Sequence, residues 1–168
     1  ESVTITPFAV SHCTADFNPA TREKPYYCCA SFLVETPAKK AVLLWDVDDL
    51  NSWIVNPETD AHRQTLDRIQ EPDYLFVDCN AWAAVASATG SKTGHPAFMT
   101  VIDYARHLRL KDTSQTVLLH LSGHEDQRGN SGWGWDDLTW QRAAQAEWTR
   151  RGIAGAVCVP KIGDEFEM

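Results

Sequence analysis

A short apolar run, Thr116–Leu119, ends at His120, and a group of ionisable side chains follows it: His124, Glu125 and Asp126. Runs of this length and composition are typical of buried strands. In layered α/β proteins, ligands, metals and catalytic groups gather at strand ends. A histidine there is more often a hydrogen-bonded structural residue than a metal ligand, so the interpretation depends on whether other reactive side chains converge on it.

Three further strand-like runs end in the same way. A β-branched run at the start of the chain ends at His12, and two later apolar runs end at Asp46 and Asp78. Each has a structural alternative, because an aspartate after a buried strand often only caps a helix or fixes a loop. His95 follows a stretch of small and polar residues and precedes a predicted helix, which suits a residue that moves over a substrate.

Hydrophobic periodicity predicts an α/β chain. The predicted strands cover residues 2–10, 26–35, 41–45, 73–79, 116–119 and 156–159. Pro7 favours an edge position for the first strand, and residues 36–40 predict a hairpin turn between the second and third. Helices are predicted at 61–69, from His95-Pro96 to Leu108, and from a cap at Asp136 or Asp137 to Gly152.

Length and charge limit the remaining choices. A chain of 168 residues is long enough for one packed core and too short for two, so one unit over residues 1–168 is expected. The formal net charge of −8 argues against nucleic-acid binding by phosphate neutralisation. No membrane span and no signal peptide are recognised, and five cysteines in mostly apolar surroundings indicate reduced thiols. A cytoplasmic location is therefore expected.

The order of these elements, from about Val3 to Asp126, resembles the C-terminal half of metallo-β-lactamase-fold hydrolases. It is most similar to the branch that contains ribonuclease Z and the cyclic phosphodiesterase of phosphonate degradation. A weaker match links Gly163–Met168 to the terminal strand of the family. The resemblance implies an α/β fold that is half of an αββα sandwich, with a mixed sheet and flanking helices.

The resemblance also implies roles for individual residues. His12, after a "TP-x-x-V" strand, corresponds to a ligand of one metal, and Asp46 corresponds to the carboxylate that bridges two. His120, in an "L-x-H-x-S" segment, corresponds to a ligand of the second metal. His95 holds the place of a histidine that acts on the leaving group, so His95 and Asp46 are the implied catalytic residues. The implied cofactors are two divalent ions, zinc or manganese. Second-shell acids such as Asp78 or Asp126 would orient the ligand rings.

Two features depart from the family pattern. The main metal signature, H-x-H-x-D-H, is absent from the 168 residues, so the chain supplies only three of the usual ligands. In addition, Val47 follows Asp46 where the family usually has threonine, and His124 comes four residues after His120 where three is more usual.

Three hypotheses follow. In the first, the chain is the C-terminal part of a metal-dependent hydrolase of small phosphodiester or related ester substrates, and is complete only with an N-terminal half or second chain carrying H-x-H-x-D-H. In the second, it is a non-catalytic binding or assembly domain. In the third, it is a one-metal protein that uses His12, Asp46 and His120. The half-fold also predicts an exposed apolar sheet face, which would favour homodimerisation or pairing with the missing half.

Overall fold

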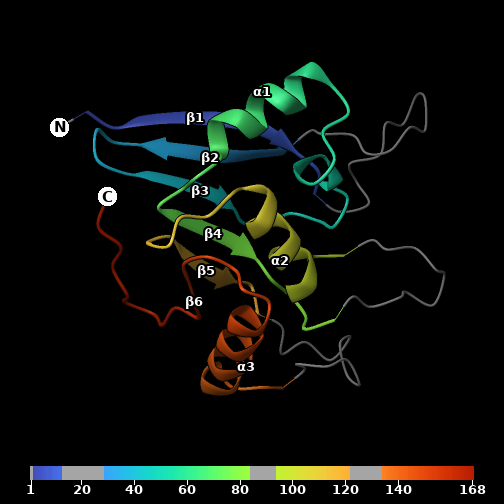
Figure 1. Ribbon diagram of the computed structural model, residues 1–168, viewed down its shortest axis with the longest axis vertical. Helices are drawn as coiled ribbons and strands as arrows, with labels where there is room; N and C mark the ends of the chain where they lie inside the picture. Colours follow the sequence, from blue (N-terminus) through green and yellow to red (C-terminus); the bar gives the residue numbers. More distant parts are fainter. Residues whose placement is uncertain (1, 13–28, 84–93, 122–133) are drawn as a thin grey trace.

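The structure is a computed structural model that describes residues 2–12, 29–83, 94–121 and 134–168. Within these residues the chain forms one six-stranded sheet in the order β1-β2-β3-β4-β5-β6, shown in Figure 1. The strands are β1 Thr4–Val10, β2 Cys29–Glu35, β3 Lys40–Leu44, β4 Tyr74–Asp78, β5 Gln115–Leu119 and β6 Ala156–Cys158. The predictions for His124, Asp126 and residues 26–28 of the second predicted strand concern residues outside the described ranges.

The sheet is mixed, as predicted. The β1–β2 and β2–β3 pairs are antiparallel, whereas β3, β4, β5 and β6 are parallel to one another. Because β1 is two antiparallel steps from β3, both strands run in the same direction. The carboxyl ends of β1, β3, β4 and β5 therefore lie at one edge of the sheet.

The first strand occupies an edge of the sheet, as its proline predicts. Pro7 pairs with Phe32 of β2 and has no backbone N–H to donate to a second neighbour. A tight turn joins β2 to β3, in which the Thr36 amide donates to the Lys39 carbonyl at 2.9 Å. The Thr36 hydroxyl also accepts from the Lys39 amide at 3.0 Å. These local bonds fix the hairpin.

The helices are α1 Asp60–Ile69, α2 Phe98–His107 and α3 Asp137–Arg150, with a single 3-10 turn, η1, at Ser52–Ile54. Thr59 caps α1 by accepting from the His62 amide at 3.1 Å, and Asp136 caps α3 by accepting from the Thr139 amide at 2.7 Å. Side-chain caps of this kind satisfy amides that have no partner inside the helix. The predicted cap at Asp136 is confirmed.

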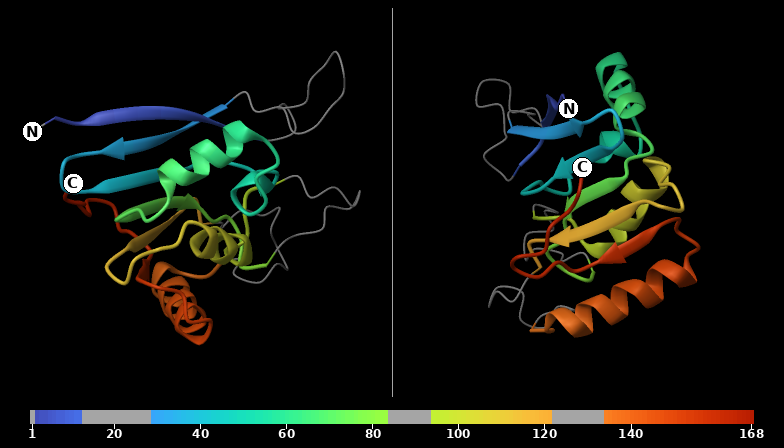
Figure 2. Two further views of the ribbon diagram at one scale, coloured as in Figure 1. Left: turned by 45° about the horizontal axis from the view of Figure 1, so that its top comes forward. Right: turned by 90° about the vertical axis from the view of Figure 1, so that its left-hand side faces the viewer.

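All three helices cover the same face of the sheet, as the two views of Figure 2 show. Each contributes its predicted apolar stripe, and the core is built from these stripes and the inward side chains of the strands. The stripe of α2 is Phe98, Val101, Ile102 and Ala105, and that of α3 is Trp140, Ala144 and Trp148; all are at most 1% exposed. Burial of three Trp side chains, Trp53, Trp140 and Trp148, makes this core large for the length of the chain.

The opposite face of the sheet is also apolar, although no described helix covers it. Side chains alternate along a strand, and the register places the following residues on this face: Ile5, Pro7 and Ala9 of β1, Ala30, Phe32 and Val34 of β2, and Ala41 and Leu43 of β3. Ile5 is 62% exposed. A sheet with one solvated face normally alternates apolar and polar residues, so this pattern is that of strands meant to be buried on both sides. We call this surface the open face; the apolar face predicted from the sequence is exposed at Ile5 and partly exposed at Phe32 and Val34, whereas Ala41 is buried.

The C-terminal segment crosses the open face only at β4. The Phe166 ring packs edge-on against Tyr74 and Phe76, with ring centroids 5.8 and 5.1 Å apart. The Lys39 ammonium donates to the Glu167 carbonyl at 2.7 Å and to the Tyr74 hydroxyl at 3.0 Å. Residues 163–168 form no strand, so the predicted match to a terminal strand is wrong: Phe166 attaches this segment by its side chain, without a backbone ladder.

His62, in the first turn of α1, is half-buried. Its ring stacks on Trp53 with centroids 5.5 Å apart and an interplanar angle of 24°, which covers the indole from the α1 side.

Among the described helices, none has the length and apolar composition that crossing a membrane requires. The cytoplasmic location remains a prediction.

Candidate metal centre

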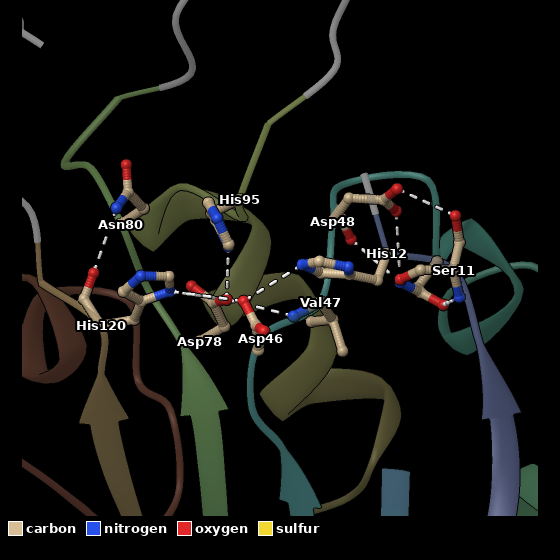
Figure 3. Close-up of polar contacts among 10 residues, drawn as sticks. Ser11, His12, Asp46, Val47, Asp48, Asp78, Asn80, His95 and His120 are labelled. Carbon is tan, nitrogen blue, oxygen red and sulfur yellow. Dashed lines mark hydrogen bonds and ion pairs between the residues drawn. The ribbon is translucent and has the colours of Figure 1, made fainter. Parts of the chain in front are cut away.

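Four ionisable side chains converge where three strands end. Asp46 follows β3, Asp78 is the last residue of β4, His120 follows β5, and His95 lies just before α2. Each offers a ligand atom, and the four atoms all lie within 4.8 Å of one another. Figure 3 shows the side chains pointing toward one point above the strand ends.

Asp78 is at the centre of this group and is fully buried. Its Oδ2 accepts from the Val47 amide at 3.1 Å and lies 2.6 Å from His95 Nδ1 and 3.3 Å from His120 Nδ1. Its Oδ1 is also buried and has no hydrogen-bond partner among the residues that the structure describes. A buried carboxylate oxygen without a donor is costly, so the arrangement is one that a cation would complete.

The second carboxylate, Asp46, is more open to solvent, with 62% of its side chain exposed. Its Oδ1 lies 3.2 Å from His12 Nε2 and 4.0 Å from His120 Nδ1. One carboxylate oxygen thus lies between imidazoles carried by two different strands. The role that the resemblance implies for Asp46, a carboxylate that bridges two metals, remains a prediction.

His95 and His120 form the imidazole pair of the centre, with ring centroids 4.3 Å apart and planes at 77°. The hydrogen bond to Asp78 raises the pKa of His95 above its ordinary value. The negative charges of Asp78 and Asp46 also raise it, whereas partial burial lowers it. His95 therefore retains a proton to higher pH than an exposed histidine. The side-chain amide of Asn80 donates to the His120 carbonyl at 3.2 Å and holds the backbone that carries the His120 ring.

Two site residues have left-handed backbone conformations. The φ angles of Asp46 and His120 are 51° and 61°. This region disfavours residues with a Cβ atom by about 1 kcal/mol or more. Both residues lie directly after a strand end, where a sharp turn directs the side chain back over the sheet edge. The surrounding hydrogen bonds must hold these turns in place.

The donor set fits a divalent metal. Imidazole nitrogens and carboxylate oxygens are ligands for zinc and manganese, and the group combines two of each type. Cys79, the neighbour of Asp78, does not join the set: its Sγ lies 4.0 Å from the Ala81 carbonyl, inside the core. Burial raises the pKa of the Cys79 thiol far above its ordinary value, so the thiolate that a metal requires is disfavoured.

The structure thus brings together all four residues predicted for the site. His95, Asp46 and His120 lie in the tight group, and His12 contacts it through Asp46. Asp78, predicted only to orient ligand rings, lies at the centre. The sequence contains a signal for Asp78 as well, since Asp78 ends an apolar run as Asp46 does.

No protein-family model matches the chain, and no curated protein matches it by sequence. Fifteen solved chains match its fold. The metallo-β-lactamase fold protein YhfI from Bacillus subtilis superposes with a TM-score of 0.56 at 17% identity, over 98% of this chain and 50% of that one. Unliganded yeast PDE1 superposes with a TM-score of 0.51 at 12% identity, over 95% of this chain and 44% of that one.

The chain has part of the metallo-β-lactamase fold. It spans about half the length of the solved structures that it matches. The half-fold expected from the sequence is therefore confirmed, as a mixed sheet with helices on one face. Within this metallo-β-lactamase fold, the converging side chains lie at the carboxyl edge of the parallel strands.

Proposed function

We propose that the chain is the C-terminal half of a metal-dependent hydrolase that cleaves a phosphodiester or a related ester. The observation that carries the proposal is the convergence of Asp46, Asp78, His95 and His120, whose ligand atoms all lie within 4.8 Å of one another. The fold is consistent with it, since it is the metallo-β-lactamase fold. Asp46, Asp78 and His120 lie at or just after strand ends, and regular elements place catalytic groups more precisely than loops do.

In this proposal His12, Asp46 and His120 hold zinc or manganese, with Asp78 as a further carboxylate at the same centre. Divalent cations bound there would polarise the phosphoryl oxygen and make a water molecule acidic enough to attack near neutral pH. Asp46 is the residue on which this depends most, because its Oδ1 faces both His12 and His120.

His95 acts on the leaving group. Its Nδ1 is 2.6 Å from Asp78 Oδ2, which fixes the ring and stabilises the imidazolium. The other ring nitrogen is then available to donate a proton to the departing oxygen. The hydrogen bond to Asp78 raises the pKa of His95, which favours the protonated ring.

The open face supports the proposal that another half completes the protein. Strands β1–β3 carry apolar side chains on both faces, yet the main core cluster, which includes Val42, Leu44 and Leu75, lies on the helix side. The matched solved chains are about twice as long as this chain. We propose that a second sheet, from an N-terminal half or separate chain carrying H-x-H-x-D-H, packs on this face, as in sheet-on-sheet packing generally. Homodimerisation through the same face is the competing outcome.

Native mass spectrometry tests the proposal, because one spectrum reports chain mass, partner and metal count together. A second polypeptide with about two metals supports the split hydrolase, and hydrolysis of bis(p-nitrophenyl) phosphate by that assembly supports the reaction class. A bare 18.8 kDa chain that takes up no zinc or manganese when either is added contradicts the proposal, and the non-catalytic binding domain becomes the better account.

A further inference from the structure

The segment after β3, Val47–Asn51, connects three other segments that carry site residues. Three consecutive backbone amides donate to three different partners: Val47 to Asp78 Oδ2 at 3.1 Å, Asp48 to the Ser11 carbonyl at 3.2 Å, and Asp49 to the Gly94 carbonyl at 3.0 Å. Ser11 immediately precedes His12, and Gly94 immediately precedes His95. The segment therefore links β1, β4 and the start of α2 at the positions where their functional side chains begin.

The side chain of Asn51 holds the end of β1 from two sides. Its Oδ1 accepts from the Ser11 amide at 2.8 Å, and its Nδ2 donates to the Ser11 carbonyl at 2.9 Å. A carboxamide can pair in this way because it carries both a donor and an acceptor. Trp53 Nε1 also donates to Asn51 Oδ1 at 3.3 Å, which fixes the orientation of the amide. Ser11 and Asn51 are both fully buried.

Asp48 also bonds to Ser11 through its side chain, in addition to the bond from its amide. Its Oδ2 accepts from the Ser11 hydroxyl at 2.9 Å, while its Oδ1 accepts from the Leu50 amide at 2.9 Å. Asp48 is 2% exposed. Buried polar groups are expensive unless hydrogen-bonded, and such networks define one geometry more sharply than apolar packing does. Here the geometry that is defined is that of Ser11, the residue before His12.

We propose that Asn51 is a positioning residue for His12. By holding both backbone groups of Ser11, it directs the His12 ring to Asp46, where Nε2 and Oδ1 are 3.2 Å apart. The proposal rests on the proposed function in taking His12 as a metal ligand. Asn51 makes no contact with a reacting group and acts only through the ligand that it places.

The first test uses the metal-free 168-residue chain and the imidazole ¹H–¹⁵N signals of its histidines. Asn51→Ala is expected to broaden or split the His12 signals, because the residue before it is released from two hydrogen bonds. The His107 signals serve as the internal control, since that ring is held by the Asp103 carbonyl on α2. A single His12 signal set with unchanged shifts and widths in Asn51→Ala would overturn the proposal.

The second test is a double-mutant cycle on zinc affinity, measured by calorimetry. Asn51→Ala is expected to weaken zinc binding roughly 10-fold or more, as loss of a ligand-orienting partner typically does. In a His12→Ala background the same substitution is expected to have no further effect on zinc affinity, because Asn51 affects the metal only through His12. Equal losses in both backgrounds would show that Asn51 acts on overall structure, contrary to the proposal.

Matched variants keep the result decisive. Ser114→Ala removes a buried serine hydroxyl that donates to the Pro72 carbonyl at the opposite edge of the sheet, and it is expected to lower stability without changing the His12 signals. If Asn51→Ala does not fold, both tests are made on Asn51→Gln, which keeps the carboxamide but moves it one methylene out of register with the two backbone groups of Ser11. A wild-type chain that binds no zinc refutes the proposed function, whereas the metal-free signals still decide whether Asn51 positions His12.

Discussion

The proton on His95 gives the sharpest prediction for a single residue. If His95 protonates the leaving oxygen, His95→Gln should lower kcat by roughly 10²-fold or more for a diester with an alkyl leaving group. The loss should be much smaller for bis(p-nitrophenyl) phosphate, because p-nitrophenolate departs without a proton. Rates for both substrates, measured with the complete metal-loaded assembly, check this. Equal losses on the two substrates would assign His95 to metal binding, and His107→Gln is the control.

The same histidine predicts a pH dependence of stability. The bond to Asp78 raises the pKa of His95 in the folded chain, so the folded state holds the proton more tightly than the unfolded state. The stabilisation is therefore fully present below the ordinary histidine pKa of about 6.5 and is lost as pH rises through the higher folded value. Urea unfolding of the metal-free chain should show this decline in wild type and a flatter profile in His95→Gln. Identical profiles would contradict the assignment.

At the scale of an element, α2 is expected to be the helix on which the site depends most. Phe98, in its first turn, is fully buried and stacks on Trp82 with centroids 4.7 Å apart. Phe98→Ala should lower the free energy of unfolding by about 3–5 kcal/mol, from lost burial and the cavity left behind. Leu138→Ala, at a residue of α3 that is 56% exposed, should change it by no more than about 0.5 kcal/mol. Chemical denaturation measures both, and equal effects would show that this contact does not anchor the helix.

The sequence was sufficient for the strands and helices because their burial follows simple periods. It also marked the site, since His12, Asp46, Asp78 and His120 each end an apolar run. Contacts that no periodic pattern in the sequence indicates could not be predicted. The bond from Asn51 to Ser11 joins residues 40 positions apart through one buried amide, and no pattern within the Asp46–Asn51 segment distinguishes it from a solvated turn. Likewise, the attachment of Phe166 to Tyr74 and Phe76 depends on shape, which a six-residue resemblance to a strand did not capture.

For the whole molecule, the open face predicts how the chain associates. Ile5→Lys and Val34→Lys replace paired side chains on that face, opposite the core. Each substitution should leave the isolated chain folded, because lysine there is exposed, yet remove association with a second sheet or a second copy. Light scattering after size exclusion and native mass spectrometry measure this. Leu138→Lys on α3 is the matched control and should leave association unchanged. If it and the two open-face variants associate to the same extent, the open face is not the interface.

The central claim is that the carboxyl edge of the sheet holds a divalent cation between carboxylates and imidazoles from separate strands. Zinc titration of the purified 168-residue chain and of Asp46→Asn, followed by calorimetry with circular dichroism as the check on folding, tests it most directly. We predict that the wild-type chain binds zinc, that Asp46→Asn loses binding while keeping its fold, and that Asp60→Asn, changed at an exposed carboxylate of α1, binds as wild type does. Zinc binding that is absent in the wild type, or unchanged in Asp46→Asn, would contradict the account.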